Sequence, residues 1–301
     1  MMSNYHNPVM LQECIDGLAI RKDGTYVDVT FGGGGHSKEI LKHLGKDGML
    51  LAFDQDADAQ QNLIDDERFV FVDQNFRYLK NFCRLHGAIP VSGILADLGV
   101  SSYQFDQAER GFSIRFDAEL DMRMNQSSEL TAKQVVNTYS EAELHRIFGI
   151  YGEIQNAKSL ANTVVTARLN APIITVADLK NAIADRIPRG KENKYLAQVF
   201  QALRIEVNQE LEALKDFLIQ SAEVLETGGR LVVMSYHSLE DRLVKNFIAK
   251  GKFSGEVEKD FFGNDQKPFD AVSRGAITAS DEEIAVNNRA RSAKLRIAIK
   301  K

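Results

Sequence analysis

Residues 25–40 read TYVDVTFGGGGHSKEI, and this order of residue types is typical of one kind of supersecondary unit. Residues 25–31 are rich in β-branched and aromatic side chains, which favour a strand, and the run stops at the four glycines of residues 32–35. Apolar residues then recur at Ile40, Leu41 and Leu44, the spacing of one helix face. The segment predicts a strand, a glycine loop and a helix in succession.

The same alternation continues along the chain. GMLLAFD (48–54), FVFVD (69–73) and SGILADLG (92–99) are apolar runs of strand length, and helical patterns of about ten residues separate them. Strands that are apolar on both faces and alternate with helices indicate a parallel sheet covered on both sides. The sequence therefore predicts an α/β protein of the Rossmann-like class.

The strand signal is absent from residues 105–207, where helical patterns follow a polar loop. Two of these helices should begin with capping boxes, Ser140 with Glu143 and Thr175 with Asp178. A strand pattern returns at RLVVMSY (230–236), and two weaker strands, 270–277 and 293–299, are expected to form an antiparallel edge. We therefore expect a discontinuous core, 1–104 and 208–301, and a helical insertion, 105–207, that recognises the substrate.

Composition narrows the class of protein. The 301 residues include no apolar run near the ~20 residues that span a bilayer, and the first ten residues do not resemble a secretion signal, so we expect a cytoplasmic protein without membrane contact. Cys14 and Cys83 lack the spacing of a disulfide framework or a thiolate zinc site, and the six histidines do not cluster with acids, so no metal site is expected.

Charge limits the part that nucleic acid can play. A net charge of −5 argues against binding by bulk electrostatics, which depends on Lys and Arg displacing counterions from phosphates. Local basic patches remain as candidate RNA contacts. They comprise Arg186, Arg189, Lys191 and Lys194, and, near the carboxyl terminus, Arg289, Arg291, Lys294 and Arg296.

The glycine loop and Asp54 together predict an adenosine-type cofactor. Glycines let backbone amides approach a ligand, and a carboxylate at the next strand end is placed to accept both ribose hydroxyls. Ser37 replaces the last glycine of the dinucleotide fingerprint G-x-G-x-x-G, and the Gly-Lys-Ser/Thr of a triphosphate loop is missing. Asp28 would also repel phosphates and attract a cationic group. S-adenosylmethionine thus fits better than NAD or ATP, with an NAD-dependent dehydrogenase on the same sheet as the alternative.

Two further clusters follow predicted strands. DLGVSSYQ (97–104) ends a strand expected to adjoin the first one at the topological switch point, where ligands bind. SYHSLEDR (235–242) contains Ser, His and Asp but no G-x-S-x-G elbow. Ser238 and Asp241 are instead expected to cap a helix, which leaves His237 to face the substrate cleft.

Seven blocks of the sequence resemble the bacterial small-subunit ribosomal RNA cytidine N4-methyltransferase family, from His6 to about Ala298. The blocks are HNPVML (6–11), DVTFGGGGHS (28–37), DLGVSSYQFDQAERGFS (97–113), LDMRM (120–124), FQALRIEVNQEL (200–211), SYHSLEDRLVK (235–245) and NNRARSAKLRIA (287–298). The resemblance implies a class I methyltransferase core with a mostly parallel seven-stranded sheet. It also implies S-adenosylmethionine as donor and one cytidine in the decoding region of 16S rRNA, within the small ribosomal subunit, as target. A homodimer is compatible with it, and a non-catalytic ribosome-assembly factor is the alternative.

The resemblance also implies roles for single residues. The cofactor contacts would be Gly34, Gly35, His36, Asp54, Phe76, Asp97 and Gln104. The catalytic candidates are Asp97, Ser101, Tyr103 and His237, with Asp97 accepting the hydrogens of cytosine N4 and Tyr103 stacking on the base.

One block departs from the family pattern. Residues 193–198 read NKYLAQ where the family usually has His-Pro-x-Thr-Arg, and Lys194 and Arg204 are the candidates to replace the missing charge. The charged segment that contains Arg110 and Arg123 is expected to form an RNA-facing wall.

Overall fold

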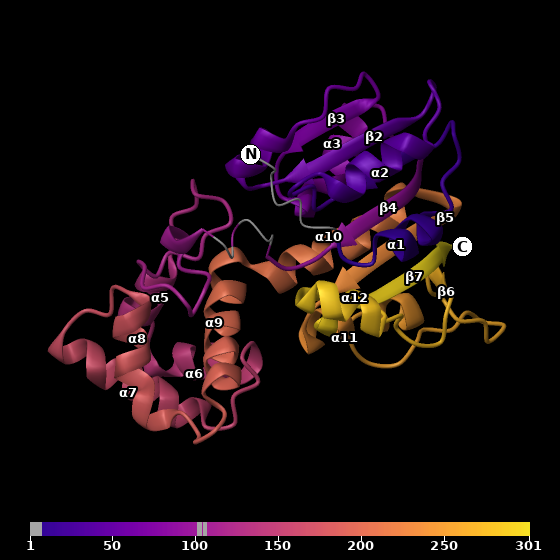
Figure 1. Ribbon diagram of the computed structural model, residues 1–301. Helices are drawn as coiled ribbons and strands as arrows, with labels where there is room; N and C mark the ends of the chain where they lie inside the picture. The colour runs from indigo at the N-terminus through magenta and orange to yellow at the C-terminus, as the bar shows by residue number, and fades with distance from the viewer. Residues whose placement is uncertain (1–7, 101–103, 105–106) are drawn as a thin grey trace. The chain divides into compact units, whose positions relative to one another are not determined.

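The computed structural model describes residues 8–100, 104 and 107–301, and the chain divides into two compact units. The first unit comprises residues 1–99 and 211–301, and the second comprises residues 100–210. Figure 1 shows the sheet of the first unit and the helices of the second.

The first unit is built on a seven-stranded sheet with the order β3-β2-β1-β4-β5-β7-β6. Strands β1 to β5 run parallel, and β7 pairs antiparallel with both β5 and β6. The strands are β1 (Thr25–Asp28), β2 (Met49–Asp54), β3 (Phe69–Asp73), β4 (Val91–Asp97), β5 (Leu225–Ser235), β6 (Phe269–Ala271) and β7 (Lys294–Lys300). This confirms the expected α/β fold, and the pairing of β1 with β4 confirms the switch point. The expected antiparallel edge is also confirmed, because β6 and β7 pair antiparallel at one side of the sheet, with β6 outermost.

Helices cover both faces of this sheet (Figure 1). One face packs against α3 (Leu79–Leu85), α10 (Glu210–Val224) and α11 (Ser238–Lys250), and the other against α1 (Leu11–Leu18) and α2 (Gly35–His43). A short helix, α12 (Asp281–Val286), follows β6. All seven residues of β4 except Asp97 are buried, as expected for a central strand whose two faces are both covered.

The second unit is helical. The helices of its described residues include α5 (Ala132–Thr138), α6 (Glu141–Ile150), α7 (Ala157–Asn170), α8 (Val176–Ile183) and α9 (Glu192–Asn208). Both expected capping boxes are present: Ser140 and Glu143 cap α6, and Thr175 and Asp178 cap α8. These caps satisfy the free amides of each first turn, so the sequence placed both helix starts correctly.

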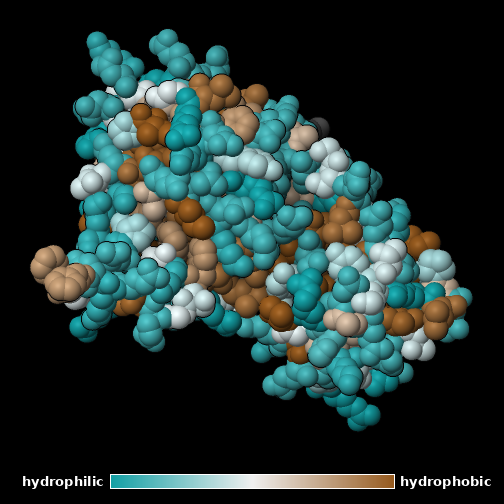
Figure 2. Space-filling model, turned by 180° about the vertical axis from the view of Figure 1, so that it is seen from behind, coloured by the Kyte–Doolittle hydropathy of each residue, from teal (hydrophilic) through white to brown (hydrophobic). Residues whose placement is uncertain are grey.

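The surface seen in Figure 2 is mostly hydrophilic, with smaller hydrophobic areas between the polar ones. Most large apolar side chains of the first unit lie instead in the clusters on the two faces of the sheet. Within the described ranges, no helix combines the length and the apolar character that a membrane span requires.

The start of α11 corrects one prediction. The N-cap of this helix is His237, and Glu240 accepts hydrogen bonds from the backbone amides of Tyr236 (2.9 Å) and His237 (3.4 Å). Asp241 therefore takes no part in the cap with Ser238. Its Oδ1 instead accepts a hydrogen bond from Nε of Arg296 at 2.7 Å, and Nζ of Lys294 lies 3.6 Å from its Oδ2. These contacts connect α11 to β7.

This tie gives a prediction about stability. The Asp241 and Arg296 side chains are only 13% and 14% exposed, so removing the acid leaves a cation poorly compensated in a mostly buried place. We expect Asp241→Ala to lower the free energy of unfolding by about 2 kcal/mol, measured by urea denaturation at neutral pH.

The matched control is Asp270→Ala. Asp270 pairs with Lys267 at 3.1 Å but its side chain is 59% exposed, so the loss should stay below about 0.5 kcal/mol. Equal effects of the two substitutions would contradict the role given to Asp241.

Candidate functional site

The loop after β1 is shaped by glycine. Gly32 and Gly34 have positive φ values of 51° and 74°, and Gly34 is the N-cap of α2. A Cβ on Gly34 would lie 3.0 Å from the Phe31 ring, whereas a Cβ on Gly33 would meet nothing within 4 Å. The loop therefore needs glycine at Gly34 for its own conformation, and beside Gly33 it leaves open space in which a ligand could approach the backbone.

Asp54, at the end of β2, holds the loop from the neighbouring strand. Its Oδ2 accepts the amide of Gly32 at 2.8 Å, and its Oδ1 accepts the amide of Asp56 at 2.9 Å. Burial raises the pKa of Asp54 to about 6, while these two amides oppose the rise. Each carboxylate oxygen can accept a further hydrogen bond, so Asp54 could hold a pair of ribose hydroxyls.

Asp28 is not exposed to a cationic ligand, contrary to the expectation from the sequence. Its side chain is buried, with 1% of the residue exposed, and it accepts hydrogen bonds from Ser37 Oγ (2.7 Å) and the amide of Thr30 (3.1 Å). An acid enclosed in this way braces the loop and does not present itself to a cationic ligand. The structure also gives a reason for serine, and not glycine, at position 37. A glycine could not supply the hydroxyl that donates a hydrogen bond to Asp28.

The other cofactor candidates divide between the two units. Gly35 is the first residue of α2, and a Cβ there would lie 2.3 Å from Pro8 Cγ, so Pro8 packs on the loop. Phe76 begins a short 3-10 helix after β3 and contacts Phe217, with ring centroids 5.6 Å apart. Gln104 is buried and belongs to the second unit, so it is not placed relative to the loop.

Asp97 ends β4 on the other side of β1. Its amide donates to Thr30 Oγ1 at 2.7 Å, and its Oδ1 accepts the hydroxyl of Tyr236 at 2.7 Å. Its Oδ2 lies 4.0 Å from Nδ1 of His36, whose Nε2 is 3.2 Å from the carbonyl oxygen of Val9. Burial raises the pKa of Asp97 to about 6, and His36 and the Tyr236 hydroxyl oppose the rise. This carboxylate is thus an acceptor that stays mostly ionised at neutral pH.

Tyr236 is a site residue that was not singled out from the sequence. It follows β5 directly, and β5 pairs with β4 so that Met234 stands beside Asp97. A signal was available, because an aromatic residue just past the end of a strand next to β4 must lie near Asp97. The predicted catalytic residues Ser101 and Tyr103 lie outside the described residues.

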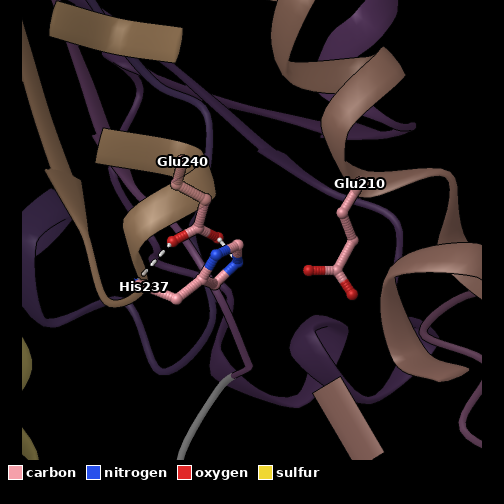
Figure 3. Close-up of side chains that lie close together, drawn as sticks. All are labelled: Glu210, His237 and Glu240. Atoms are coloured by element: carbon pink, nitrogen blue, oxygen red, sulfur yellow. Dashed lines mark hydrogen bonds and ion pairs between the residues drawn. The ribbon is translucent and has the colours of Figure 1, made fainter. Parts of the chain in front are cut away.

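His237 and Glu240 lie close together at the start of α11 (Figure 3). Nε2 of His237 is 3.1 Å from Oε1 of Glu240, and both side chains are at least nine-tenths buried. His237 thus faces the acid of its own helix turn. Two protein ligands are fewer than zinc sites use, and the absence of a metal site stays a prediction. Glu210, also drawn in Figure 3, is the last residue of the second unit and pairs there with Arg204.

Arginines of the second unit that were expected to face RNA are engaged within it. Arg123 donates to both oxygens of Asp121, at 2.7 and 2.8 Å, and to two backbone carbonyl oxygens. Arg110 donates to the carbonyl oxygens of Arg123 (2.6 Å) and Met124 (3.0 Å). Arg204 forms a two-point ion pair with Glu210, whereas Lys194 is exposed. Of the two residues expected to replace the missing family charge, only Lys194 is therefore exposed.

The glycine loop gives a prediction that needs no ligand. Gly34→Ala forces a left-handed conformation on alanine and crowds the Phe31 ring, so it should cost about 2 kcal/mol of unfolding free energy. Gly33→Ala, one residue earlier, should change stability by less than about 1 kcal/mol, because its Cβ enters open space. Urea denaturation of both variants measures the difference, and equal losses would contradict this description of the loop.

Known proteins resemble this chain over nearly its whole length. It is 58% identical over 300 residues to ribosomal RNA small subunit methyltransferase H of Christiangramia forsetii, covering 100% of this chain and 99% of that protein. It is 60% identical over 296 residues to the protein of the same name from Flavobacterium johnsoniae, covering 98% of each. A structure described as an rRNA methylase from Streptococcus thermophilus aligns with 95% of this chain and 92% of its own chain at 14% identity, with a TM-score of 0.39. The sequence matches the MraW methylase family over residues 3–301, and this chain therefore belongs to that family.

Proposed function

We propose that this chain transfers a methyl group from S-adenosylmethionine to the exocyclic N4 of a cytidine in the decoding region of 16S rRNA, within the small ribosomal subunit. The observation that carries the proposal is the order β2-β1-β4, which puts Asp54 and Asp97 on either side of the glycine loop. Membership of a methylase family supports it, as does the name of the relatives, ribosomal RNA small subunit methyltransferase H.

The residues of the loop suit this cofactor. The open space beside Gly33 would admit the adenosine, and the free lone pairs of Asp54 would accept its ribose hydroxyls. His36 and Phe76, which follow β1 and β3 at the same edge of the sheet, complete the proposed cofactor contacts with Gly34, Gly35, Asp97 and Gln104. When bound, the cofactor supplies an electrophilic methyl group on sulfur. A dehydrogenase, the alternative drawn from the sequence, is set aside because the chain is a methylase family member.

Asp97 is the proposed catalytic residue. The N4 lone pair of cytosine is delocalised into the ring, so the amino group is a poor nucleophile until its hydrogens are held. Oδ2 of Asp97 would accept one N4 hydrogen, which favours a pyramidal nitrogen and offsets the positive charge that develops there. As the bond from N4 to the methyl carbon formed, the bond from that carbon to sulfur would break and leave its electron pair on sulfur, and N4 would lose one proton to water.

The helical unit is the proposed RNA-recognition part. Exposed basic residues lie in the first turn of α9 or shortly before it in the chain, and they could contact phosphates. They are Arg186, Arg189, Lys191 and Lys194. The target cytidine would have to leave its stack, which costs least in irregular RNA. We place the reaction in the cytoplasm, and self-association as a homodimer stays a prediction.

The proposal is tested by nucleoside mass spectrometry of small-subunit RNA from cells with and without the gene for this chain. N4-methylcytidine should be present only when the chain is present. Purified chain and S-adenosylmethionine should restore the modification in vitro. Unchanged N4-methylcytidine in cells that lack the gene would contradict the proposal. It would favour the alternative, a non-catalytic ribosome-assembly factor.

Asp97→Asn separates chemistry from cofactor binding. Asparagine keeps the shape and a carbonyl oxygen but loses the charge, so the single-turnover methylation rate should fall at least ~100-fold. The affinity for S-adenosylmethionine, measured by calorimetry, should change by less than about tenfold. Near wild-type turnover would remove Asp97 from the mechanism.

Asp54→Ala should act on the cofactor instead. Losing two hydrogen bonds from ribose hydroxyls to a carboxylate should weaken S-adenosylmethionine binding by roughly 100-fold. Asp73→Ala is the matched control, because Asp73 stands beside Asp54 at the exposed end of the next strand, β3, and should leave the affinity unchanged. If calorimetry shows similar affinities for both variants, Asp54 does not hold the cofactor.

A further inference from the structure

Asp97 has two oxygens with different surroundings. Oδ1 receives the Tyr236 hydroxyl at 2.7 Å, and Oδ2 lies 4.0 Å from Nδ1 of His36, beyond hydrogen-bond distance. Burial and the neighbouring carboxylate raise the pKa of Tyr236, so its hydroxyl stays protonated and can only donate to Asp97. One oxygen of the proposed catalytic acid is thus permanently engaged by a phenol.

The position of Tyr236 is fixed at its backbone and at its ring. Glu240, only 3% exposed, accepts the amide of Tyr236 at 2.9 Å from the first turn of α11. The ring lies against Gly99, where a Cβ would come within 3.4 Å of Cδ2 of Tyr236. Gly99 has a φ of 98°, so the chain leaving β4 turns beside the ring. A tyrosine held at both ends needs little reorganisation to keep its hydroxyl on Asp97.

We propose that Tyr236 is a positioning residue for methyl transfer: its hydroxyl occupies Oδ1 of Asp97 and leaves Oδ2 to accept the amino group of cytosine, while Glu240 keeps Tyr236 in place. This inference rests on the proposed function. It assigns a role to the Tyr236 hydroxyl, and it gives the two oxygens of one carboxylate different roles: the protein holds Oδ1, and Oδ2 accepts the substrate.

The hydroxyl also favours the ionised form of Asp97, because a hydrogen bond to a carboxylate stabilises its charge. The other groups that act on Asp97 come from four elements. They are His36 on α2, which lowers the pKa of Asp97, Asp28 on β1 and Glu240 on α11, which raise it, and Cys14 on α1, which is also near. Removing the hydroxyl of Tyr236 should therefore raise the pKa of Asp97 above about 6, whereas removing the charge of Glu240 should lower it.

The experiment compares Tyr236→Phe and Glu240→Gln with the wild-type chain. The first readout is the NMR titration of the Asp97 carboxyl carbon, and the second is the single-turnover methylation rate as a function of pH. For Tyr236→Phe, the acid limb of the rate profile should move upward by about one pH unit. The rate should then fall about fivefold near pH 6 and less than about threefold near pH 8.5, with the KM for S-adenosylmethionine unchanged.

Glu240→Gln provides a change of opposite sign. Its amide oxygen can still accept the Tyr236 amide, but the negative charge near Asp97 is gone, so the acid limb should stay in place or move downward. Tyr139→Phe is the matched control, because the Tyr139 hydroxyl also donates to a carboxylate, Glu206 Oε1 at 3.0 Å, within the helical unit. It should leave the titration of Asp97 unchanged.

Three results would overturn the inference. They are a Tyr236→Phe profile that overlays the wild-type profile, a loss of rate that is equal at every pH, and an upward movement in Glu240→Gln. A wild-type chain that makes no N4-methylcytidine would instead overturn the proposed function. In that case the carboxyl titration, which needs no turnover, still decides whether Tyr236 holds Asp97.

Discussion

Burial of several carboxylates at one edge of the sheet is the constraint on which the site depends. The adjacent strands β2, β1 and β4 end in Asp54, Asp28 and Asp97. Like charges brought together away from water raise one another's pKa, and Asp28 contributes in this way to the raised values of both Asp54 and Asp97. The loops after these strands are organised around supplying donors to the three acids.

Each acid meets this constraint with a different set of donors. Asp28 uses the hydroxyl of Ser37 and the amide of Thr30, Asp54 uses two backbone amides, and Asp97 uses a phenol. Thr30 connects the first and the last, because its hydroxyl oxygen accepts the amide of Asp97. Asp28 is closed off, whereas Asp54 and Asp97 keep lone pairs for a ligand. In the proposed function, a cationic sulfonium donor would relieve the remaining repulsion.

In the helical unit, several arginines are likewise paired with acids and carbonyl oxygens of the same unit. The side chains of Arg123 and Arg110 stabilise the segment between Gly111 and α5, because they donate hydrogen bonds to Asp121 and to backbone carbonyl oxygens. Arg204 is held by Glu210 where α9 gives way to α10. A cluster of arginines in the sequence therefore indicated local structure here, whereas the cations near the start of α9 are exposed.

Local patterns in the sequence were sufficient to predict the fold and the glycine loop. The alternation of strands and helices, the glycines at residues 32–35 and the capping boxes of α6 and α8 all depend on neighbours a few residues apart, so they can be seen in the sequence. The order of β1 and β4 also followed from general rules for parallel sheets. The antiparallel pairing of β6 with β7 was expected as well, but the side of the sheet that this pair joins, next to β5, was not, because a strand pair can add to either free edge.

Partners far apart in the chain were settled only by the folded structure. Tyr236 and Asp97 are 139 residues apart; the strand order places Tyr236 near Asp97, but the sequence does not say that its hydroxyl donates to that acid. The same holds for Asp241, which the local pattern assigned to a helix cap and the fold assigned to Arg296. Backbone periodicity is encoded by nearby residues, whereas the hydrogen-bond partner of a buried polar side chain depends on which strands and helices pack beside it.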